Sequence, residues 1–286
     1  MRETRRRRSA AAVYFFPLMA AMFLALAAVG ECADGEASLT ADSMNYDPRT
    51  GWIVVSGNVH FTRPDGELFG DRGGGSANGQ SFEIHGNVRG SFSAESLDIA
   101  CESLNLSSVG GSTARRRITA SGDVVLTRRA DRLSAESVTW EMGRNSYKAS
   151  GGVTGTLGGY YIDSDLAARN GNQFWAHNLR RYEDRRRNIR LSAAKASGLM
   201  QGDAIVELVA DGGVSMNMPD SQGLMSTVTG DKGVYSVARG TIVITGNATV
   251  TQGARKLRAS SIVYHLNSGR VEAIGQPTLV IGTQGN

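Results

Sequence analysis

The chain has 286 residues, with 31 lysine and arginine residues against 27 aspartate and glutamate residues. Five of the basic residues and one of the acidic residues lie in residues 1–30, so the remainder carries 26 of each sign. The basic balance therefore belongs to the first 30 residues, and the rest of the chain favours no nucleic-acid partner. Two cysteines, Cys32 and Cys101, leave open whether a disulfide forms.

Residues 1–30 differ in composition from everything that follows. Five arginines precede an apolar run from Ala10 to Gly30, and the run ends in small residues. This order predicts a secretory signal peptide. The alternative is a retained membrane anchor, since the run is about long enough to cross a bilayer. Either way, residues 31–286 are expected outside the cytoplasm.

A glycine-centred frame recurs along residues 31–286. In its first copy, Ile53, Val55, Val59 and Phe61 alternate around Gly57, so these residues share one face of a strand. A glycine in mid-strand marks a bend or a bulge. Seven copies are centred on Gly57, Gly86, Gly122, Gly151, Gly212, Gly246 and Gly275.

A second frame alternates with the first and contains a step of three residues, which predicts a bulge. Its copies lie at 39–46, 92–99, 133–140 and 257–264, with a weaker one at 228–235. The two frames and their turns make a unit of 29 residues, and about eight units predict roughly 16 strands. An acidic residue often follows the small residue of this frame: Asp42, Asp71, Glu95, Glu136, Asp165 and Asp231.

The repeat is broken near residues 166–211, where we expect an irregular insertion. No segment of the mature chain has a convincing helical period. We therefore predict an all-β domain over residues 31–286, built as one continuous antiparallel array.

An antiparallel meander with one apolar face must hide that face in a sandwich, a barrel or a solenoid. Glycine bends at one level in every unit would fold the sheet along a line, giving two walls and an apolar interior. Such an interior suits fatty acyl chains, because each buried methylene contributes about 0.8 kcal/mol. The alternative is a sandwich core whose walls simply pack together.

The text of residues 41–71, "ADSMNYDPRTGWIVVSGNVHFTRPDGELFGD", and of residues 230–277 resembles the OstA-like domain of LptA, LptC and the N-terminus of LptD. The resemblance is good over 39–155 and 224–282 and poor over 166–211. It implies a taco-like open β-jellyroll, without enzymatic activity, whose interior carries the lipid A acyl chains of lipopolysaccharide in the Gram-negative periplasm. It also implies edge-strand addition to other Lpt-type β-jellyroll proteins, or to further copies of itself head to tail, through strands near 39–46 and 271–282.

The groove-facing positions implied by the resemblance are all apolar and lie in the two frames. They are Ile53, Val55, Val59, Phe61, Val138, Trp140, Ile242, Ile244, Val250, Ile262 and Tyr264.

The stretch "LRRYEDRRRNIR" (179–190) holds six arginines. Arg185, Arg186 and Arg187 are candidates for contacts with the phosphates or acidic sugars of a lipopolysaccharide headgroup. The alternative is a solvated loop.

Other polar patterns predict no catalytic or metal site and no cofactor. The glycine-rich stretch 70–79 lacks the Lys-Ser/Thr of a phosphate loop, and the four histidines have no metal-ligand spacing. Asp163 and Asp165 form a carboxylate pair that suits Ca²⁺ or glycoside chemistry, although Asp165 occupies the usual acidic slot of the repeat. Two rival functions therefore stay open: a carbohydrate-active β-solenoid enzyme that uses the 160–190 region, and a structural array that self-assembles through its ends.

Overall fold

The computed structural model describes residues 37–282, apart from 65, 94–95, 110–111, 142–145, 158–159, 186–187, 202–203, 220–222, 266–267 and 269. Every regular element in this part is a β-strand, which confirms the all-β prediction. The strands are β1 (Ser38–Thr40), β2 (Ser43–Asp47), β3 (Trp52–Arg63), β4 (Gly66–Ser76), β5 (Ser81–Phe92), β6 (Leu97–Val109), β7 (Ser112–Arg128), β8 (Asp131–Glu141), β9 (Ser146–Leu157), β10 (Tyr160–Asn170), β11 (Gln173–Asp184), β12 (Ile189–Gln201), β13 (Ala204–Pro219), β14 (Met225–Ser236), β15 (Thr241–Gln252), β16 (Arg255–His265), β17 (Val271–Ile274) and β18 (Thr278–Ile281).

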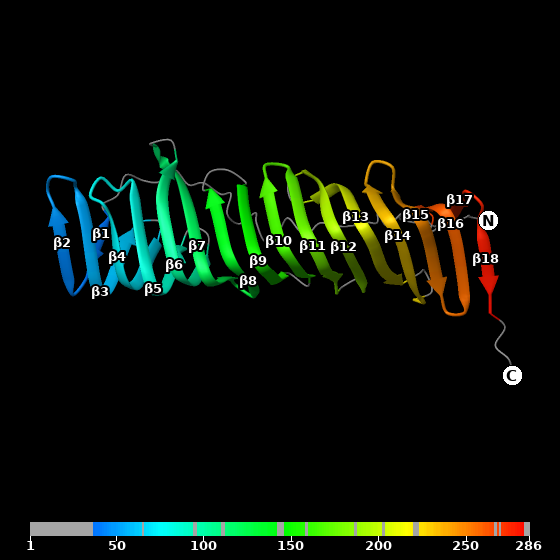
Figure 1. Ribbon diagram of the computed structural model, residues 1–286, viewed down its shortest axis with the longest axis horizontal. Coiled ribbons are helices and arrows are strands. Elements are labelled where there is room, and N and C mark those ends of the chain that lie inside the picture. The colour runs from blue at the N-terminus through cyan, green and yellow to red at the C-terminus, as the bar shows by residue number, and fades with distance from the viewer. Residues whose placement is uncertain are drawn as a thin grey trace, which may run out of the picture.

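The strands form one antiparallel sheet that follows the chain from one end to the other (Figure 1). At the first edge, β1 and β2 pair with the two halves of β3. At the last edge, β17 and β18 pair with the two halves of β16. Each short pair therefore acts as one interrupted strand, which agrees with the expected array of roughly 16 strands. The sheet stays open, with its two edges at opposite ends of the long axis.

A two-residue corner interrupts the pairing at the same level along the sheet. In β3 the register shifts between Ser56 and Val59, where Gly57 and Asn58 both have positive φ angles of 75° and 48°. A Cβ on Gly57 would overlap the carboxylate of Asp42, which lies over the corner from the neighbouring strand. The Asn58 side chain donates a 2.9 Å hydrogen bond from Nδ2 to Asp42 Oδ2. Glycine is thus required at this position for two reasons: its φ angle is positive, and the Asp42 side chain leaves no room for a Cβ.

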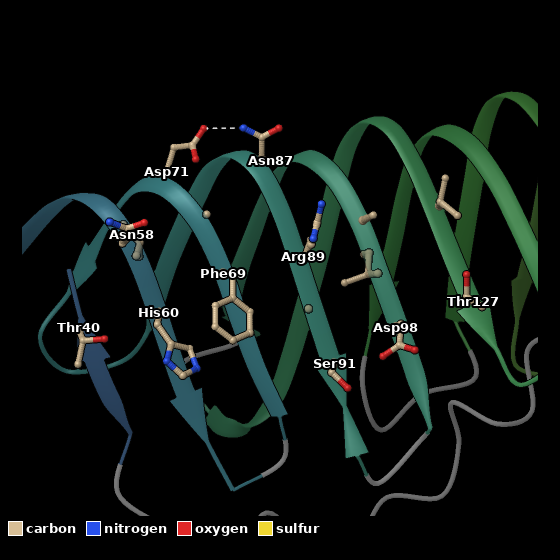
Figure 2. Close-up of a pocket in the computed structure, with 16 residues that line it drawn as sticks. Thr40, Asn58, His60, Phe69, Asp71, Asn87, Arg89, Ser91, Asp98 and Thr127 are labelled. Atoms are coloured by element: carbon tan, nitrogen blue, oxygen red, sulfur yellow. Dashed lines mark hydrogen bonds between the residues drawn. The ribbon is translucent and has the colours of Figure 1, made fainter. Parts of the chain in front are cut away.

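The same corner recurs, so every unit of the sheet bends at one level. Asn87 donates to Asp71 at 2.9 Å, Asn178 to Asp165 at 2.8 Å and Asn247 to Asp231 at 3.4 Å. Figure 2 shows the strands arching over at this level, with the second wall of the sheet behind the first. Five of the six acidic positions noticed in the sequence therefore lie over corners: Asp42, Asp71, Glu136, Asp165 and Asp231.

The folded sheet buries its apolar face between two walls. Val55 and Val59 lie on either side of a corner, and each is only 1% exposed. One buried cluster spans β3 to β10 and a second spans β11 to β16; we call these the N-terminal and C-terminal clusters. The open β-jellyroll expected from the sequence is therefore the observed fold.

Residues 166–211, expected to form an irregular insertion, belong instead to the ladder of β10 to β13. The prediction was wrong because it depended on a central glycine, and backbone hydrogen bonds sustain the ladder without it. At the β11 corner Asn178 keeps a positive φ of 49°, but His177 precedes it in place of glycine. Interior positions here carry small residues such as Ala176 and Ala196.

The frame copy at 92–99 was also placed wrongly. Phe92 ends β5 and Leu97 begins β6, so a hairpin separates them. The acidic residue over the Gly122 corner is Glu102, further along β6. Glu95 lies outside the described residues.

Residues 1–30 and Cys32 lie outside the described residues, so the signal or anchor and the disulfide stay predictions. In the part that the structure describes, Cys101 is a buried thiol in no disulfide. That same part contains no helix long and apolar enough to cross a membrane.

Replacing Gly246 with alanine tests the corner. Gly246 has a φ of +72°, and an added Cβ would overlap the Asp231 carboxylate; Gly253, in the next turn, has a φ of +54° with nothing within 4 Å of such a Cβ. The φ strain common to both variants costs about 1–2 kcal/mol, and overpacking at Gly246 adds about 1–3 kcal/mol. Urea unfolding of Gly246→Ala and of its control Gly253→Ala measures the difference in their free energies of unfolding. Equal losses of stability in the two variants would contradict a corner closed by Asp231.

Candidate functional site

All eleven predicted groove residues face the interior of the folded sheet. Two groups belong to the buried clusters themselves: Val55, Val59, Val138 and Trp140 to the N-terminal one, and Ile242, Ile244 and Ile262 to the C-terminal one. The other four are partly buried and pack against those clusters: Ile53, Phe61, Val250 and Tyr264. The period-two frames therefore predicted which face these side chains occupy; that they contact lipid stays a prediction.

The C-terminal end of the trough contains a cavity of about 300 Å³. Its lining is mainly apolar, and two methionines give it side chains that adapt to irregular shapes. The volume is at the lower end of the range of about 300–1,000 Å³ typical of small-molecule sites. Five of the predicted groove residues contribute to the lining, which comprises Met216, Met218, Pro219, Ser226, Val228, Ile242, Ile244, Val250, Gln252, Ile262, Tyr264 and Val271.

The walls pack more closely in the N-terminal cluster. Ile84, Leu104 and Val124 have no exposed surface there. Over this part the interior matches the sandwich-core alternative, because the side chains of the walls fill the space between them. An apolar guest in this half must displace side chains or move the walls apart.

Both edges of the sheet expose apolar side chains that continue the lining of the trough. At the first edge, Met44 and Tyr46 are about half exposed and stand in register with Val55 and Ile53 of the interior. At the last edge, Leu279 is 60% exposed and pairs with Leu257. The apolar lining of the trough therefore extends to both edges, and each edge also presents a strand with one unpaired side.

The arginine-rich stretch lies at the hairpin between β11 and β12. Part of its positive charge is neutralised by a carboxylate of the same stretch. Glu183 is nearly buried and contacts Arg181, Arg190 at 3.2 Å and Arg185 at 4.0 Å. Burial by itself raises the pKa of Glu183, but hydrogen bonds from Arg181 and Arg190 lower it overall. Arg185 also lies over the Tyr161 ring at 6.0 Å and remains exposed. Arg186 and Arg187 lie outside the described residues.

The carboxylate pair Asp163 and Asp165 is held by one arginine. Arg180 Nη2 lies 2.6 Å from Asp163 Oδ1, and Arg180 also contacts Asp165. Hydrogen bonds from Asn178 and then Arg180 lower the pKa of Asp165. Both carboxylates are therefore engaged in the sheet, and the described residues contain no group of three or more potential metal ligands.

A hollow of about 920 Å³ lies over the N-terminal strands, and its polar side chains point away from the trough (Figure 2). His60 and Phe69 stack in it with ring centroids 4.2 Å apart, and His60 Nε2 lies 3.0 Å from Glu67. Arg89 and Asp98 also line it. The sequence patterns did not predict this hollow, although Phe69 at an outward-facing position was a signal for it.

Comparison with known protein families identifies the family of this chain, and that family fits a protein with an apolar trough. A sequence model of the family described as "LptA/(LptD N-terminal domain) LPS transport protein" matches residues 108–270, more than half of the chain. The chain belongs to this family. The match includes the β10–β13 stretch, where the glycine-centred repeat is interrupted.

Other comparisons are weaker. No curated protein matches this member of the LptA/LptD N-terminal family. Among solved structures, LptH, the LptA homologous periplasmic component of the lipopolysaccharide transport device from Pseudomonas aeruginosa, is 12% identical. That match covers 89% of this chain and all of LptH, with a TM-score of 0.21. The family assignment therefore rests on the sequence match.

Glu183 predicts a pH dependence of stability. Because its pKa is lowered by folding, its contribution is complete well above the unfolded value of about 4.3 and is lost as the pH falls through the folded value. Glu183→Gln should therefore reduce stability at pH 7 and lessen its fall between pH 5 and pH 3. Urea unfolding across that range, with exposed Glu207→Gln as control, checks this; an unchanged pH profile would contradict the role of Glu183.

Proposed function

We propose that this protein binds lipopolysaccharide through its lipid A acyl chains in the apolar trough and helps to bridge or shuttle it across the periplasm to the outer membrane. The observation that carries the proposal is the apolar cavity around Ile242, Ile244 and Ile262, in a chain of a lipopolysaccharide-transport family. Each methylene moved from water into such a cavity contributes about 0.8 kcal/mol.

The cavity supports entry of the lipid at the C-terminal half. Met216 and Met218 line it and can rearrange around an acyl chain at low cost. The tightly packed N-terminal half then accepts chains as the walls separate. No catalytic group is needed for this process, and we propose that the protein is not an enzyme. The engagement of Asp163 and Asp165 by Arg180 argues against the carbohydrate-active alternative.

The open edges supply the means of bridging. An exposed strand with a free backbone side can add the edge of another sheet, and apolar side chains beside it extend the trough across the junction. Tyr46 at the first edge and Leu279 at the last have this position. We propose other Lpt-type β-jellyroll proteins, or copies of this chain head to tail, as partners, and the periplasm as the location, with residues 1–30 removed or retained as an inner-membrane anchor. Arg185, Arg186 and Arg187 remain proposed contacts for the headgroup.

Ile244→Asp tests lipid capture. Ile244 is 3% exposed in the cavity wall, so an aspartate there puts a carboxylate among apolar side chains. We expect the exported variant to lose at least nine-tenths of the lipid A that co-purifies with the wild type, as quantified by mass spectrometry.

Thr245→Asp is the matched control, because Thr245 is next in the strand and faces outward, in register with Lys232. It should retain its lipid. A folded Ile244→Asp protein, verified by circular dichroism, that carries a normal amount of lipid A would refute capture by this cavity.

A further inference from the structure

One interior row of the sheet contains a charged residue. The strand pairings place Trp140 opposite Tyr147, Tyr147 opposite Arg169, and Arg169 opposite Phe174. The side chains of Trp140, Tyr147 and Phe174 are buried in the two apolar clusters. Arg169 occupies the position that Trp140 and Tyr264 hold in other copies of the frame, so a cation replaces an aromatic ring near mid-length of the trough.

Arg169 lies two residues before a turn, at the rim of its wall. It is only 2% exposed, and its Nε donates a 2.7 Å hydrogen bond to the carbonyl oxygen of Gly171. The Tyr147 side chain also hydrogen-bonds to Arg169, and burial is the main cause that raises the pKa of the Tyr147 hydroxyl. Tyr147 therefore remains a neutral hydroxyl beside a buried guanidinium.

Two further buried donors lie on these strands, Trp140 in the row itself and Ser164 five residues before Arg169. Trp140 is 5% exposed and Ser164, on β10 like Arg169, has no exposed surface. Within the described residues neither Trp140 Nε1 nor Ser164 Oγ has a hydrogen-bond partner. Buried polar atoms without partners are uncommon in folded proteins and costly, so these donors can bind acceptor groups of a ligand.

The polar groups of the row share one chemical property. An indole N–H only donates, a guanidinium offers five N–H donors and accepts nothing, and a tyrosine hydroxyl can donate. A guanidinium fork matches phosphate oxygens best and also donates to carbonyl oxygens. The matching ligand is therefore rich in acceptors and attached to apolar chains.

We propose that Trp140, Tyr147 and Arg169 form a donor site at the rim of the trough that binds the acceptor oxygens where acyl chains join the headgroup of the lipid. This inference rests on the proposed function. Acyl chains enter the apolar interior, and the phosphate or the acyl carbonyl oxygens stop at the rim, against Arg169. The site gives the trough a fixed position for the lipid along an otherwise apolar path.

Arg169→Met tests the site, because methionine keeps an apolar stem and removes every donor. Arg89→Met is the matched control, since Arg89 is exposed on the outer face. The probes are diphosphoryl lipid A, the same lipid without its phosphates, and N-phenyl-1-naphthylamine, an apolar dye without carbonyl or phosphate acceptors. Binding is measured by fluorescence titration of the purified mature protein.

We expect Arg169→Met to bind diphosphoryl lipid A at least about tenfold more weakly than the wild type, as for loss of a hydrogen bond to a charged group. Its dye binding should stay within about twofold of the wild type, and Arg89→Met should match the wild type throughout. Tyr147→Phe, which removes one hydroxyl, should show a smaller loss for lipid A alone. A loss that persists without phosphates assigns the acceptors to acyl carbonyls, and a loss confined to the diphosphoryl form assigns them to phosphate.

Unchanged lipid A affinity in folded Arg169→Met would overturn the donor site, and so would equal losses for lipid A and dye, which indicate a packing defect. A wild-type protein that binds neither lipid A nor the dye would instead refute the proposed function.

Discussion

The folding of the sheet depends on one repeated constraint, the closeness of a side chain on one strand, most often an acidic one, to the backbone at the corner of the next strand. Over five of the described glycine corners an aspartate or glutamate occupies the volume that a Cβ would need, as Asp42 does above Gly57; Ala194 and Ser260 take this place over Gly212 and Gly275. At four corners an asparagine also donates a hydrogen bond to the carboxylate, as Asn58 does to Asp42. Because the same contact recurs at one level, a sheet that would otherwise be flat closes on its apolar face.

Closure along a line, with the edges left open, explains how a carrier can be stable and still admit lipid. Backbone ladders hold each strand to its neighbours and are independent of what lies between the walls. The interior can therefore vary from tightly packed, as around Ile84, to hollow, as around Ile244, without a change of fold. Apolar attraction alone does not fix where a lipid lies along the trough, whereas the donor site at Arg169 gives the lipid a fixed position.

Much of this was predictable because a period of two assigns each side chain to a face. Ile53, Val138 and Ile262 were placed in the interior from alternation and the family resemblance. The stretch 166–211 was not, since backbone hydrogen bonding maintains a ladder whose side chains have lost the glycine signal. Arg169 was missed for a related reason: a charged residue in an apolar frame looks like a break in the pattern. Register across neighbouring strands, which sequence alone does not provide, showed that the frame continues through it.

Quenching of tryptophan fluorescence by lipid A with brominated acyl chains tests the central claim most directly. Trp140 is buried in the trough, whereas Trp175 lies on the opposite side of the alternation, next to buried Phe174. The third tryptophan of the chain is Trp52. In variants that keep only Trp140 or only Trp175 and carry phenylalanine at the other two tryptophan positions, the lipid should quench Trp140 strongly and Trp175 weakly. Equal quenching, or quenching of Trp175 alone, would show that the acyl chains lie outside the folded sheet.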